Sequence, residues 1–258
     1  MSSPAPGTLE EHVARQFGAQ AEAYVTSAVH ARGPDLDALD SLLAGQDHGR
    51  LLDLGCGGGH VSFTAAPHVA QVTAYDLSAA MLEAVAAEAG RRGLSNIVTV
   101  QGAAEALPFE DASFDVVASR YSAHHWRDLP AGLRHARRVV APDGRAVFMD
   151  VIAPENPLLD TFLQTIEMLR DPSHVRDYRA SEWIRSAEAA GFIVETLTER
   201  RLRLDFGPWV TRIATPPDHV AAIRSLQRGA SDEVRTHFAI EADGTFTLDT
   251  LTLVLMPA

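Results

Sequence analysis

Lysine is absent from this chain of 258 residues, and all 22 of its basic residues are arginine. Without lysine the protein cannot form a lysine Schiff base, anchor pyridoxal phosphate or build the lysine-containing phosphate loop of nucleoside triphosphatases. Cysteine occurs once, as Cys56, so an internal disulfide is excluded and a reducing compartment is expected. These absences remove several classes of enzyme before any motif is considered.

Long apolar runs are also missing. No uncharged apolar stretch approaches the roughly 20 residues of a membrane span, and the first residues lack the basic and apolar regions of a secretion signal. The net charge of −12 disfavours binding to phosphate backbones, which depends on clustered lysine and arginine. We therefore expect a cytoplasmic protein with no membrane span and no nucleic-acid partner. The sequence leaves the oligomeric state open, and a homodimer is one possibility.

Apolar segments of strand length alternate with helical patterns through the first 150 or so residues, which is typical of βαβ units and a parallel sheet. The predicted strands are 50–54, 69–75, 96–100, 114–119 and 144–152, with two more around 193–204 and 246–255. Helices are predicted over MLEAVAAEAGRR (81–92) with an N-cap at Ser78, at 156–169, at 180–190, near Trp209 and at 218–228. Pro142 to Gly144 predict a turn before the fifth strand.

A glycine-rich loop follows the first predicted strand, in the segment LLDLGCGGGH. Gly55, Gly57 and Gly59 would let the backbone turn sharply and approach a ligand at the carboxyl edge of a parallel sheet. Asp76 ends the second strand about 20 residues later, where an acidic side chain can accept hydrogen bonds from ribose hydroxyls. The pair of features predicts a nucleoside-containing ligand.

The position of Asp53 bears on whether this ligand is a dinucleotide or a nucleoside that carries an amino acid. Asp53 precedes the first glycine by two residues, and the glycines continue at alternate positions rather than as the G-x-G-x-x-G of dinucleotide sites. A carboxylate here would repel a pyrophosphate but could accept a hydrogen bond from an ammonium group. We therefore favour a zwitterionic amino-acid ligand over a nicotinamide dinucleotide, and an oxidoreductase remains the less favoured alternative.

The segments LLDLGCGGGH, YDLSAAML, AAEALPFEDASFDVVASR and LRHARRVVAPDGRAVFMD together resemble the class I S-adenosylmethionine-dependent methyltransferases, in particular the ubiquinone and menaquinone C-methyltransferases. The resemblance covers about residues 45–150. It implies a Rossmann-like α/β fold with a seven-stranded, mostly parallel sheet, an antiparallel last strand and helices on both faces. It also implies a single domain over 1–258, with a helical lid at 1–45, a cofactor-binding core at 46–152, and acceptor-side helices and strands at 153–258.

The resemblance also implies the cofactor and its contacts. The cofactor would be S-adenosylmethionine without a metal, and S-adenosylhomocysteine would be the product. The implied cofactor-binding residues are Asp53, Gly55, Gly57, Gly59, Asp76, Leu77, Met81, Ala103, Ala104, Arg120 and, in the lid, Tyr24. The chain departs from the family at Ala103, where an aspartate is usual before A-E-x-L-P-F, so a side-chain contact to adenine is missing. Phe17, Tyr24 and His30 either form a helical face over the cofactor or belong to a helix packed on the sheet.

The acceptor would be a small molecule entering over the end of the fourth strand, at SRYSAHHWRDL. His124 and His125 are the candidate catalytic residues, either as a general base or to orient a phenol, enol or ring nitrogen, because imidazole titrates near neutral pH. Both could instead buttress the next helix. Tyr121, Trp126, His174 and Tyr178 are expected to line the acceptor pocket. For Arg176 and Arg179, contact with an anionic acceptor and simple solvation both remain open.

The sequence thus predicts methyl transfer to a small aromatic or heteroaromatic acceptor, at carbon or nitrogen. The missing N-P-P-[FY] tetrapeptide after the fourth strand argues against methylation of DNA bases. A protein that binds the cofactor but catalyses a non-methylating reaction is the main alternative.

Overall fold

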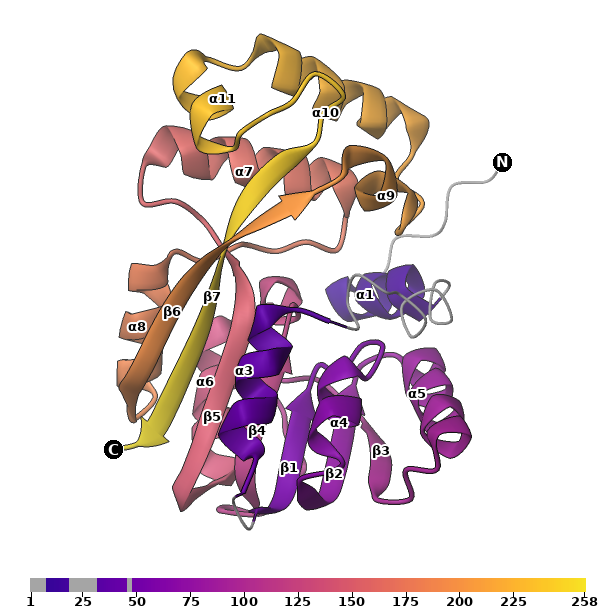
Figure 1. Ribbon diagram of the computed structural model, residues 1–258, viewed down its shortest axis with the longest axis vertical. Coiled ribbons are helices and arrows are strands. Elements are labelled where there is room, and N and C mark those ends of the chain that lie inside the picture. The colour runs from indigo at the N-terminus through magenta and orange to yellow at the C-terminus, as the bar shows by residue number, and fades with distance from the viewer. Residues whose placement is uncertain (1–7, 19–31, 46–47) are drawn as a thin grey trace.

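A twisted seven-stranded sheet forms the centre of the computed structural model, which describes residues 8–18, 32–45 and 48–258 (Figure 1). The strand order is β3-β2-β1-β4-β5-β7-β6. The strands β1 to β5 pair in parallel, whereas β7 runs antiparallel to both β5 and β6. Their bounds are β1 His48–Leu54, β2 Val69–Asp76, β3 Ile97–Gln101, β4 Phe114–Arg120, β5 Val140–Ile152, β6 Phe192–Leu204 and β7 Phe246–Pro257. The predicted sheet, with its antiparallel last strand, is confirmed.

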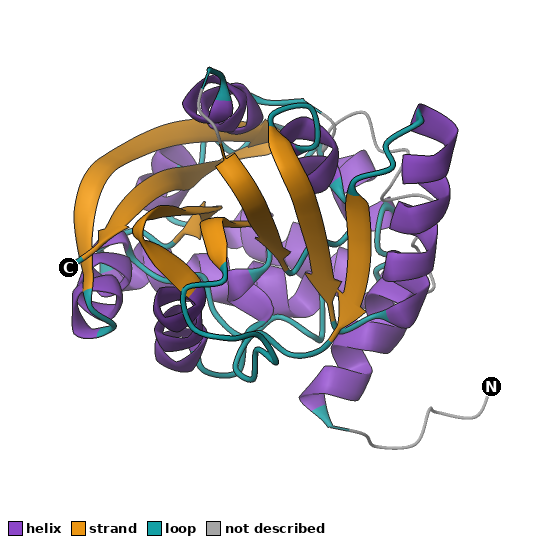
Figure 2. Cartoon of the chain, turned by 90° about the horizontal axis from the view of Figure 1, so that it is seen from below, coloured by secondary structure: helices purple, strands orange, loops and turns teal. Residues whose placement is uncertain are grey.

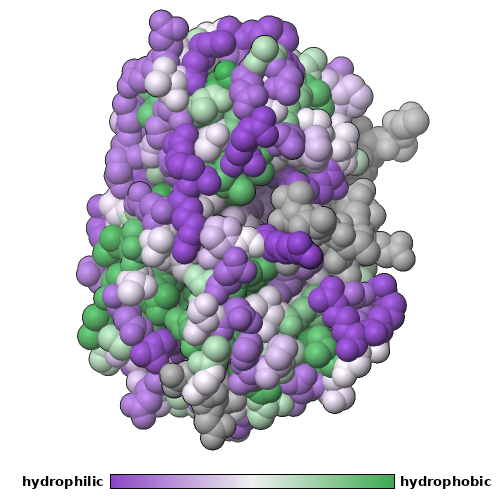
Figure 3. Space-filling view, in the orientation of Figure 1, coloured by the Kyte–Doolittle hydropathy of each residue, from purple (hydrophilic) through white to green (hydrophobic). Residues whose placement is uncertain are grey.

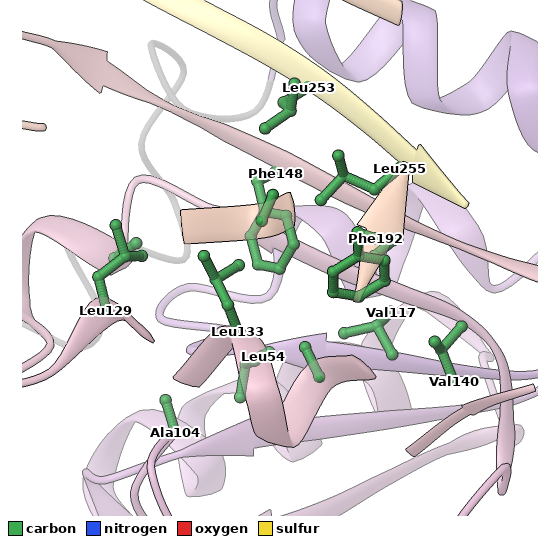
Figure 4. Close-up of a cluster of buried hydrophobic side chains, with 14 of the residues drawn as sticks. Leu54, Ala104, Val117, Leu129, Leu133, Val140, Phe148, Phe192, Leu253 and Leu255 are labelled. Carbon is green, nitrogen blue, oxygen red and sulfur yellow. The ribbon is translucent and has the colours of Figure 1, made fainter. Parts of the chain in front are cut away.

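Helices cover both faces of this sheet (Figure 2). On one face lie α3 (Pro34–Leu43), α4 (His60–Ala65) and α5 (Ala79–Arg92), and on the other lie α6 (Leu129–Val139) and α8 (Ala180–Ala189). Side chains alternate along each strand, so Leu51 faces the first group while Leu52 faces the second. Figure 4 shows part of the core on the α6 and α8 side of the sheet, which includes Leu133 of α6, Phe148 of β5 and Leu253 of β7.

Four more helices form a cap beyond the carboxyl ends of the strands, where Figure 1 shows β6 and β7 running on into it. The cap consists of α7 (Pro157–Arg170), α9 (Phe206–Thr211), α10 (Pro217–Gly229) and α11 (Asp232–His237). Its core contains Leu163, Trp209, Ile223 and Phe238, packed on Phe246 of β7. The helical insertion expected after the fifth strand is therefore present as α7.

The turn predicted at Pro142 to Gly144 is not where the fifth strand begins, which is a correction to the sequence analysis. The strand already starts at Val140, which pairs with Phe114 of β4, and the register then shifts so that Arg145 pairs with Val116. The four residues 141–144 stand opposite the single residue Asp115 in this irregularity. Gly144 is required in it, because a Cβ there would lie 2.5 Å from the carbonyl oxygen of Asp115.

Polar side chains cap the helices that flank the sheet. Ser78 accepts a hydrogen bond from the Met81 amide at the start of α5, as predicted, and Asp128 accepts one of 2.9 Å from the Ala131 amide at the start of α6. On the face shown in Figure 3, hydrophilic side chains predominate, and several apolar ones gather at the lower left. No helix in the described part of the chain has the length and apolar character needed to cross a bilayer.

Replacing Asp128 with alanine should lower the free energy of unfolding by about 1 kcal/mol, since the Ala131 amide loses its partner. Asp128→Asn is the matched control, because asparagine caps helices about as well as aspartate. Urea unfolding of the three proteins measures the difference. Equal losses in both variants would show that the capping bond does not stabilise α6.

Candidate functional site

A cavity of about 280 Å³ opens at the carboxyl ends of β1, β2 and β4, between the sheet and the cap. Its lining divides into two parts. The glycine-loop end is formed by the segment after β1, the end of β2 and the helix α1 (Leu9–Gly18); the cap end is formed by η1 (Ala123–His125), α7, α9, β6 and β7. A cavity at this edge of an open α/β sheet is the usual place for a small-molecule site.

The three glycines after β1 all have left-handed backbone angles, but for different reasons. Gly55, with φ +72°, is required because a Cβ there would overlap the Ser122 hydroxyl. Gly59, with φ +77°, packs against Val85 of α5 and is not in the cavity lining. Among the described residues, Gly57 alone of the three has no atom within 4 Å of its Cβ position, and it also lines the cavity. It is thus the glycine that leaves room for a ligand against the backbone.

Asp76 reaches from the end of β2 to this loop. One carboxylate oxygen accepts a hydrogen bond of 2.9 Å from the Gly57 amide, and the other accepts one of 2.8 Å from the Ser78 amide. Burial raises the pKa of the Asp76 carboxyl, while these two amides act in the opposite direction. Asp76 therefore fixes the loop and also lines the cavity, which is the position expected of a ribose-binding carboxylate.

Asp53 lies beneath the loop at the end of β1. Its Oδ2 accepts hydrogen bonds from the amide and the hydroxyl of Ser62, at 2.9 and 2.6 Å. Burial raises the Asp53 pKa to about 7, although the Ser62 bonds oppose that shift. A carboxyl that titrates near neutrality and lines a cavity responds strongly to a nearby cation. Sequence reasoning found Asp53 but not Ser62, which lies one turn into α4.

Some of the other residues expected to bind the cofactor line the cavity, and one does not. Leu77, Met81 and Ala104 line the glycine-loop end, whereas Ala103 does not, and its carbonyl oxygen accepts a hydrogen bond from the Tyr75 hydroxyl at 3.1 Å. Tyr75 itself lines the cavity and was not predicted. A Cβ on Gly102 would lie 2.0 Å from the Tyr75 hydroxyl oxygen, so the glycine permits this contact.

Helix α1 covers the glycine-loop end, where Leu9, Glu10 and Val13 contribute to the lining. Glu10 lies 3.6 Å from Arg127, which also lines the cavity. Of the residues proposed for a helical lid, Tyr24 and His30 are outside the described residues, as is the side chain of Phe17.

Arg120 ends β4 and Tyr121 follows it, and both line the cavity. Arg120 forms a two-pronged ion pair with Asp35 of α3, and its guanidinium lies 4.7 Å from the centre of the Tyr121 ring. Tyr121 has φ +50°, an unfavourable angle for a tyrosine, and its amide is held by the Met149 carbonyl at 2.8 Å. Burial raises the pKa of its hydroxyl, so Tyr121 remains a neutral wall residue.

Trp126 also lines the cavity, but its main contacts are structural. Its indole Nε1 donates to the Ser122 hydroxyl at 3.1 Å, and its ring occupies the space beside Gly132 of α6. Ser122 in turn lies behind Gly55. Trp126 therefore supports the glycine loop from below through Ser122.

His124 forms a dyad with Asp150 at the cavity wall. The His124 Nδ1 lies 2.6 Å from Asp150 Oδ1, and Asp150 also accepts hydrogen bonds from the amides of Ala123 and Val151. Burial lowers the pKa of His124, but Asp150 and the carboxyls of Asp177 and Glu167 outweigh it and raise the pKa to about 9. With Nδ1 bound to Asp150, Nε2 is the ring nitrogen left for a molecule in the cavity.

His125 is held differently. Its Nδ1 donates to the Ser173 carbonyl at 3.1 Å, and burial together with the charge of His124 lowers its pKa to about 4. A neutral imidazole bound to a main-chain carbonyl is suited to fixing the loop after α7 against η1. The two adjacent histidines, which the sequence could not separate, therefore differ in charge and in partners.

His174 and Tyr178, expected at the acceptor wall, lie behind it. Neither is part of the cavity lining; the His174 ring is buried 5.8 Å from the His124 ring, and its Nε2 contacts Gln164 at 3.1 Å. Tyr178 packs on Trp183 of α8. Arg176 and Arg179 both form ion pairs with Asp160 of α7, so neither is simply solvated.

The cap end contains cavity residues that the sequence analysis missed. They come from α7, β6, α9 and β7 and include Arg170, Arg200, Trp209 and Thr250. The Arg170 guanidinium lies 5.0 Å from the centre of the Trp209 ring and donates to the Trp209 carbonyl at 3.2 Å. This end thus combines aromatic and apolar surface with arginine.

Comparison with known proteins agrees with this geometry. Residues 52–148 match the model of the methyltransferase domain family. The chain is 52% identical to uncharacterized protein YafE of Escherichia coli (strain K12), over 74% of this chain and 92% of that protein. It is 36% identical to the uncharacterized methyltransferase YcgJ of Bacillus subtilis, over 87% of this chain and 88% of that protein.

The crystal structure of YcgJ superposes on the fold with a TM-score of 0.83 at 33% identity, covering 86% of this chain and 97% of that one. Demethylmenaquinone methyltransferase of Chlorobaculum tepidum is a more distant relative, 35% identical over 45% of this chain and 47% of that protein. Matches of this extent, together with the glycine loop and the two aspartates at the sheet edge, show that the chain belongs to the class I S-adenosylmethionine-dependent methyltransferases.

Proposed function

We propose that the protein transfers a methyl group from S-adenosylmethionine to carbon or nitrogen of a small aromatic or heteroaromatic acceptor bound at the cap end of the cavity. The His124–Asp150 dyad at the cavity wall is the observation that carries this proposal. The aromatic side chains of Tyr121 and Trp209 in the lining and the kinship with a quinone methyltransferase support an aromatic acceptor.

The residues of the glycine-loop end fit the cofactor. Gly57 leaves open space at the backbone, Asp76 presents a carboxylate for ribose hydroxyls, and Asp53 presents one for the ammonium group. Leu77 and Met81 supply apolar surface for the adenine ring. When bound, the cofactor supplies a methyl group on a sulfonium, which is electrophilic without further activation. The protein must therefore align the acceptor, activate it and exclude water.

His124 activates the acceptor in this account. In its neutral form, Nε2 accepts the proton from a phenol, enol or ring N–H, and Asp150 stabilises the imidazolium that results. Because a pKa of about 9 is close to that of a phenol, the transfer is nearly balanced in energy. Tyr121 and Trp209, which border the cavity, would contact the acceptor ring. His125 keeps the loop in position and takes no proton.

An acceptor screen tests the proposed function. Purified protein, freed of bound ligand, is incubated with S-adenosylmethionine and a panel of phenols, naphthols, indoles and imidazoles, each with and without a carboxylate, and S-adenosylhomocysteine is measured. We expect release that depends on an aromatic acceptor. Tight binding of S-adenosylmethionine without S-adenosylhomocysteine from any acceptor would favour the non-methylating alternative instead.

The affinity for S-adenosylmethionine is expected to depend on pH through Asp53. Below its pKa of about 7 the carboxyl is neutral and cannot pair with the ammonium group, whereas above it the carboxylate can. Affinity should therefore rise as pH increases through 7 and then level off. Titration calorimetry from pH 6 to pH 8 measures this, and Asp53→Asn should flatten the curve. A wild-type affinity that falls over the same range would contradict the assignment.

A further inference from the structure

One face of the β5–β7–β6 portion of the sheet forms a wall of the cap end. In the register of these strands, Thr250 of β7 pairs with Val151 on one side and Arg200 on the other. Two residues farther along, Leu202 pairs with Leu248. Cross-strand partners share a face of the sheet, and so do alternate residues along a strand. The wall therefore comprises Val151, Thr250, Arg200, Leu202, Leu248 and Leu204, all of which line the cavity.

Arg200 is the charged member of this wall, and within the described part of the chain its guanidinium has one neutral partner. Nη1 donates to the Thr252 hydroxyl at 2.8 Å. Among the residues that the structure describes, no carboxylate lies within ion-pair distance of Arg200. Four other arginines in the cavity lining are each near a carboxylate: Arg120 near Asp35, Arg127 near Glu10, Arg170 near Glu167 and Arg201 near Asp249.

The free edge of Arg200 has the shape of a carboxylate site. With Nη1 bound to Thr252, the Nε and Nη2 atoms remain, and these two N–H groups point in the same direction from the planar guanidinium. Such an edge matches the two oxygens of a carboxylate in a bidentate pair. A half-buried guanidinium beside leucine side chains loses hydration, so an anion that reaches it gains more than it would in open solvent.

The rest of the cap end favours an aromatic body for such an anion. Trp209 of α9, which is almost fully buried with Arg170 against its ring, borders the cavity, and Tyr121 lines it next to the end of β4. An acceptor that lies between these rings would place one end at His124 and another at the β6–β7 wall.

We propose that Arg200 binds a carboxylate on the methyl acceptor, so that the acceptors of this protein are aromatic acids rather than neutral aromatics. This inference rests on the proposed function for its placement of the acceptor. It names a specificity-determining residue: Arg200 recognises the acid group, while His124 acts at the nucleophilic end.

Benzoate and benzamide provide probes that have the same ring and differ in charge. Each is titrated into the protein saturated with S-adenosylhomocysteine, and affinity is measured by thermal shift and calorimetry. We expect wild type to bind benzoate at least roughly 10-fold more tightly than benzamide, as a charge-assisted hydrogen bond implies. Arg200→Gln should remove that preference. No preference in wild type, or the same preference in Arg200→Gln, would overturn the proposal.

Arg203→Gln is the matched control. Arg203 belongs to the same strand but is exposed, forms ion pairs with Glu241 and Asp205, and is not part of the cavity lining. The Arg203→Gln variant should therefore bind benzoate with the same affinity as wild type. Arg200→Lys serves as a second test variant if Arg200→Gln does not fold: it keeps the charge but loses the two-pronged edge, so its preference for benzoate should be weaker than that of wild type. An undiminished preference in Arg200→Lys would contradict bidentate recognition.

The proposal and the proposed function can fail separately. If benzoate binding depends on Arg200 while no acceptor in the screen yields S-adenosylhomocysteine, the carboxylate site stands and the methylation proposal fails. If neutral acceptors are methylated as efficiently as acids, or if acids are methylated equally well by Arg200→Gln, the carboxylate site is wrong and the methylation proposal stands.

Discussion

Replacing His124 with alanine should lower the turnover number by roughly 100- to 10 000-fold, the range for loss of a general base. The affinity for S-adenosylmethionine should not change, because His124 lies on the acceptor side and its main-chain carbonyl, which binds the amides of Val175 and Arg176, is retained. Steady-state kinetics with an acceptor from the screen and calorimetry with the cofactor measure the two effects.

His125→Asn is the control for this experiment. Its side-chain amide can still donate to the Ser173 carbonyl, so turnover should stay close to that of wild type. If His124→Ala instead lost thermal stability, cofactor affinity and turnover together, a structural histidine would be indicated. Similar turnover in His124→Ala and wild type would remove the base assignment.

The pH profile separates a base from a residue that merely orients the acceptor. If the neutral form of His124 takes the proton, kcat/KM should rise with pH and level off above about 9. Asp150→Asn removes the negative charge that raises the pKa of His124, so the rise should move to lower pH. An activity that falls as pH approaches 9 would mean that the imidazolium is the active form.

Replacing Asp76 with alanine should weaken the binding of S-adenosylmethionine by about 1 to 3 kcal/mol, roughly 5- to 150-fold. Two losses contribute. The amides of Gly57 and Ser78 lose their carboxylate acceptor, which loosens the loop, and the ribose hydroxyls lose theirs. Calorimetry with S-adenosylmethionine and S-adenosylhomocysteine measures the change, which should be similar for both ligands because they share the ribose.

Glu83→Ala controls for the loss of a negative charge near the same helix. Glu83 is an exposed residue of α5 and is not in the cavity lining. Its replacement should leave affinity unchanged. If Asp76→Ala also bound both ligands with wild-type affinity, the ribose assignment would have to be abandoned.

The glycine-loop end could be predicted because its determinants are local. Gly57 follows one strand and Asp76 ends the next, both strands are identified by the apolar pattern, and parallel pairing brings the ends of β1 and β2 to one edge. Spacing along the chain is therefore enough to place them together. The differing reasons for Gly55 and Gly59 could not be predicted, since they depend on Ser122 and Val85, far away in sequence.

The cap end could not be predicted in the same way. Arg200 reaches the cavity because β7 inserts between β5 and β6, an order that the sequence pattern does not specify. In the sequence, Asp150 is one more residue of a predicted buried strand. Its role becomes visible only in the folded chain, where the Ala123 amide of η1 donates to its carboxylate. His174 and Tyr178 show the opposite error: the correct segment was chosen, but its turns direct those side chains behind the wall. Non-local pairing and loop geometry determine all four positions.

The most direct test of the proposed reaction is transfer of an isotope-labelled methyl group from S-adenosylmethionine to an aromatic acid, followed by mass spectrometry of the product. Wild type should place the label on carbon or nitrogen of the acceptor and form one S-adenosylhomocysteine for each label transferred, and His124→Ala should do so far more slowly. Labelled cofactor that binds yet stays intact with every aromatic acceptor would contradict the account.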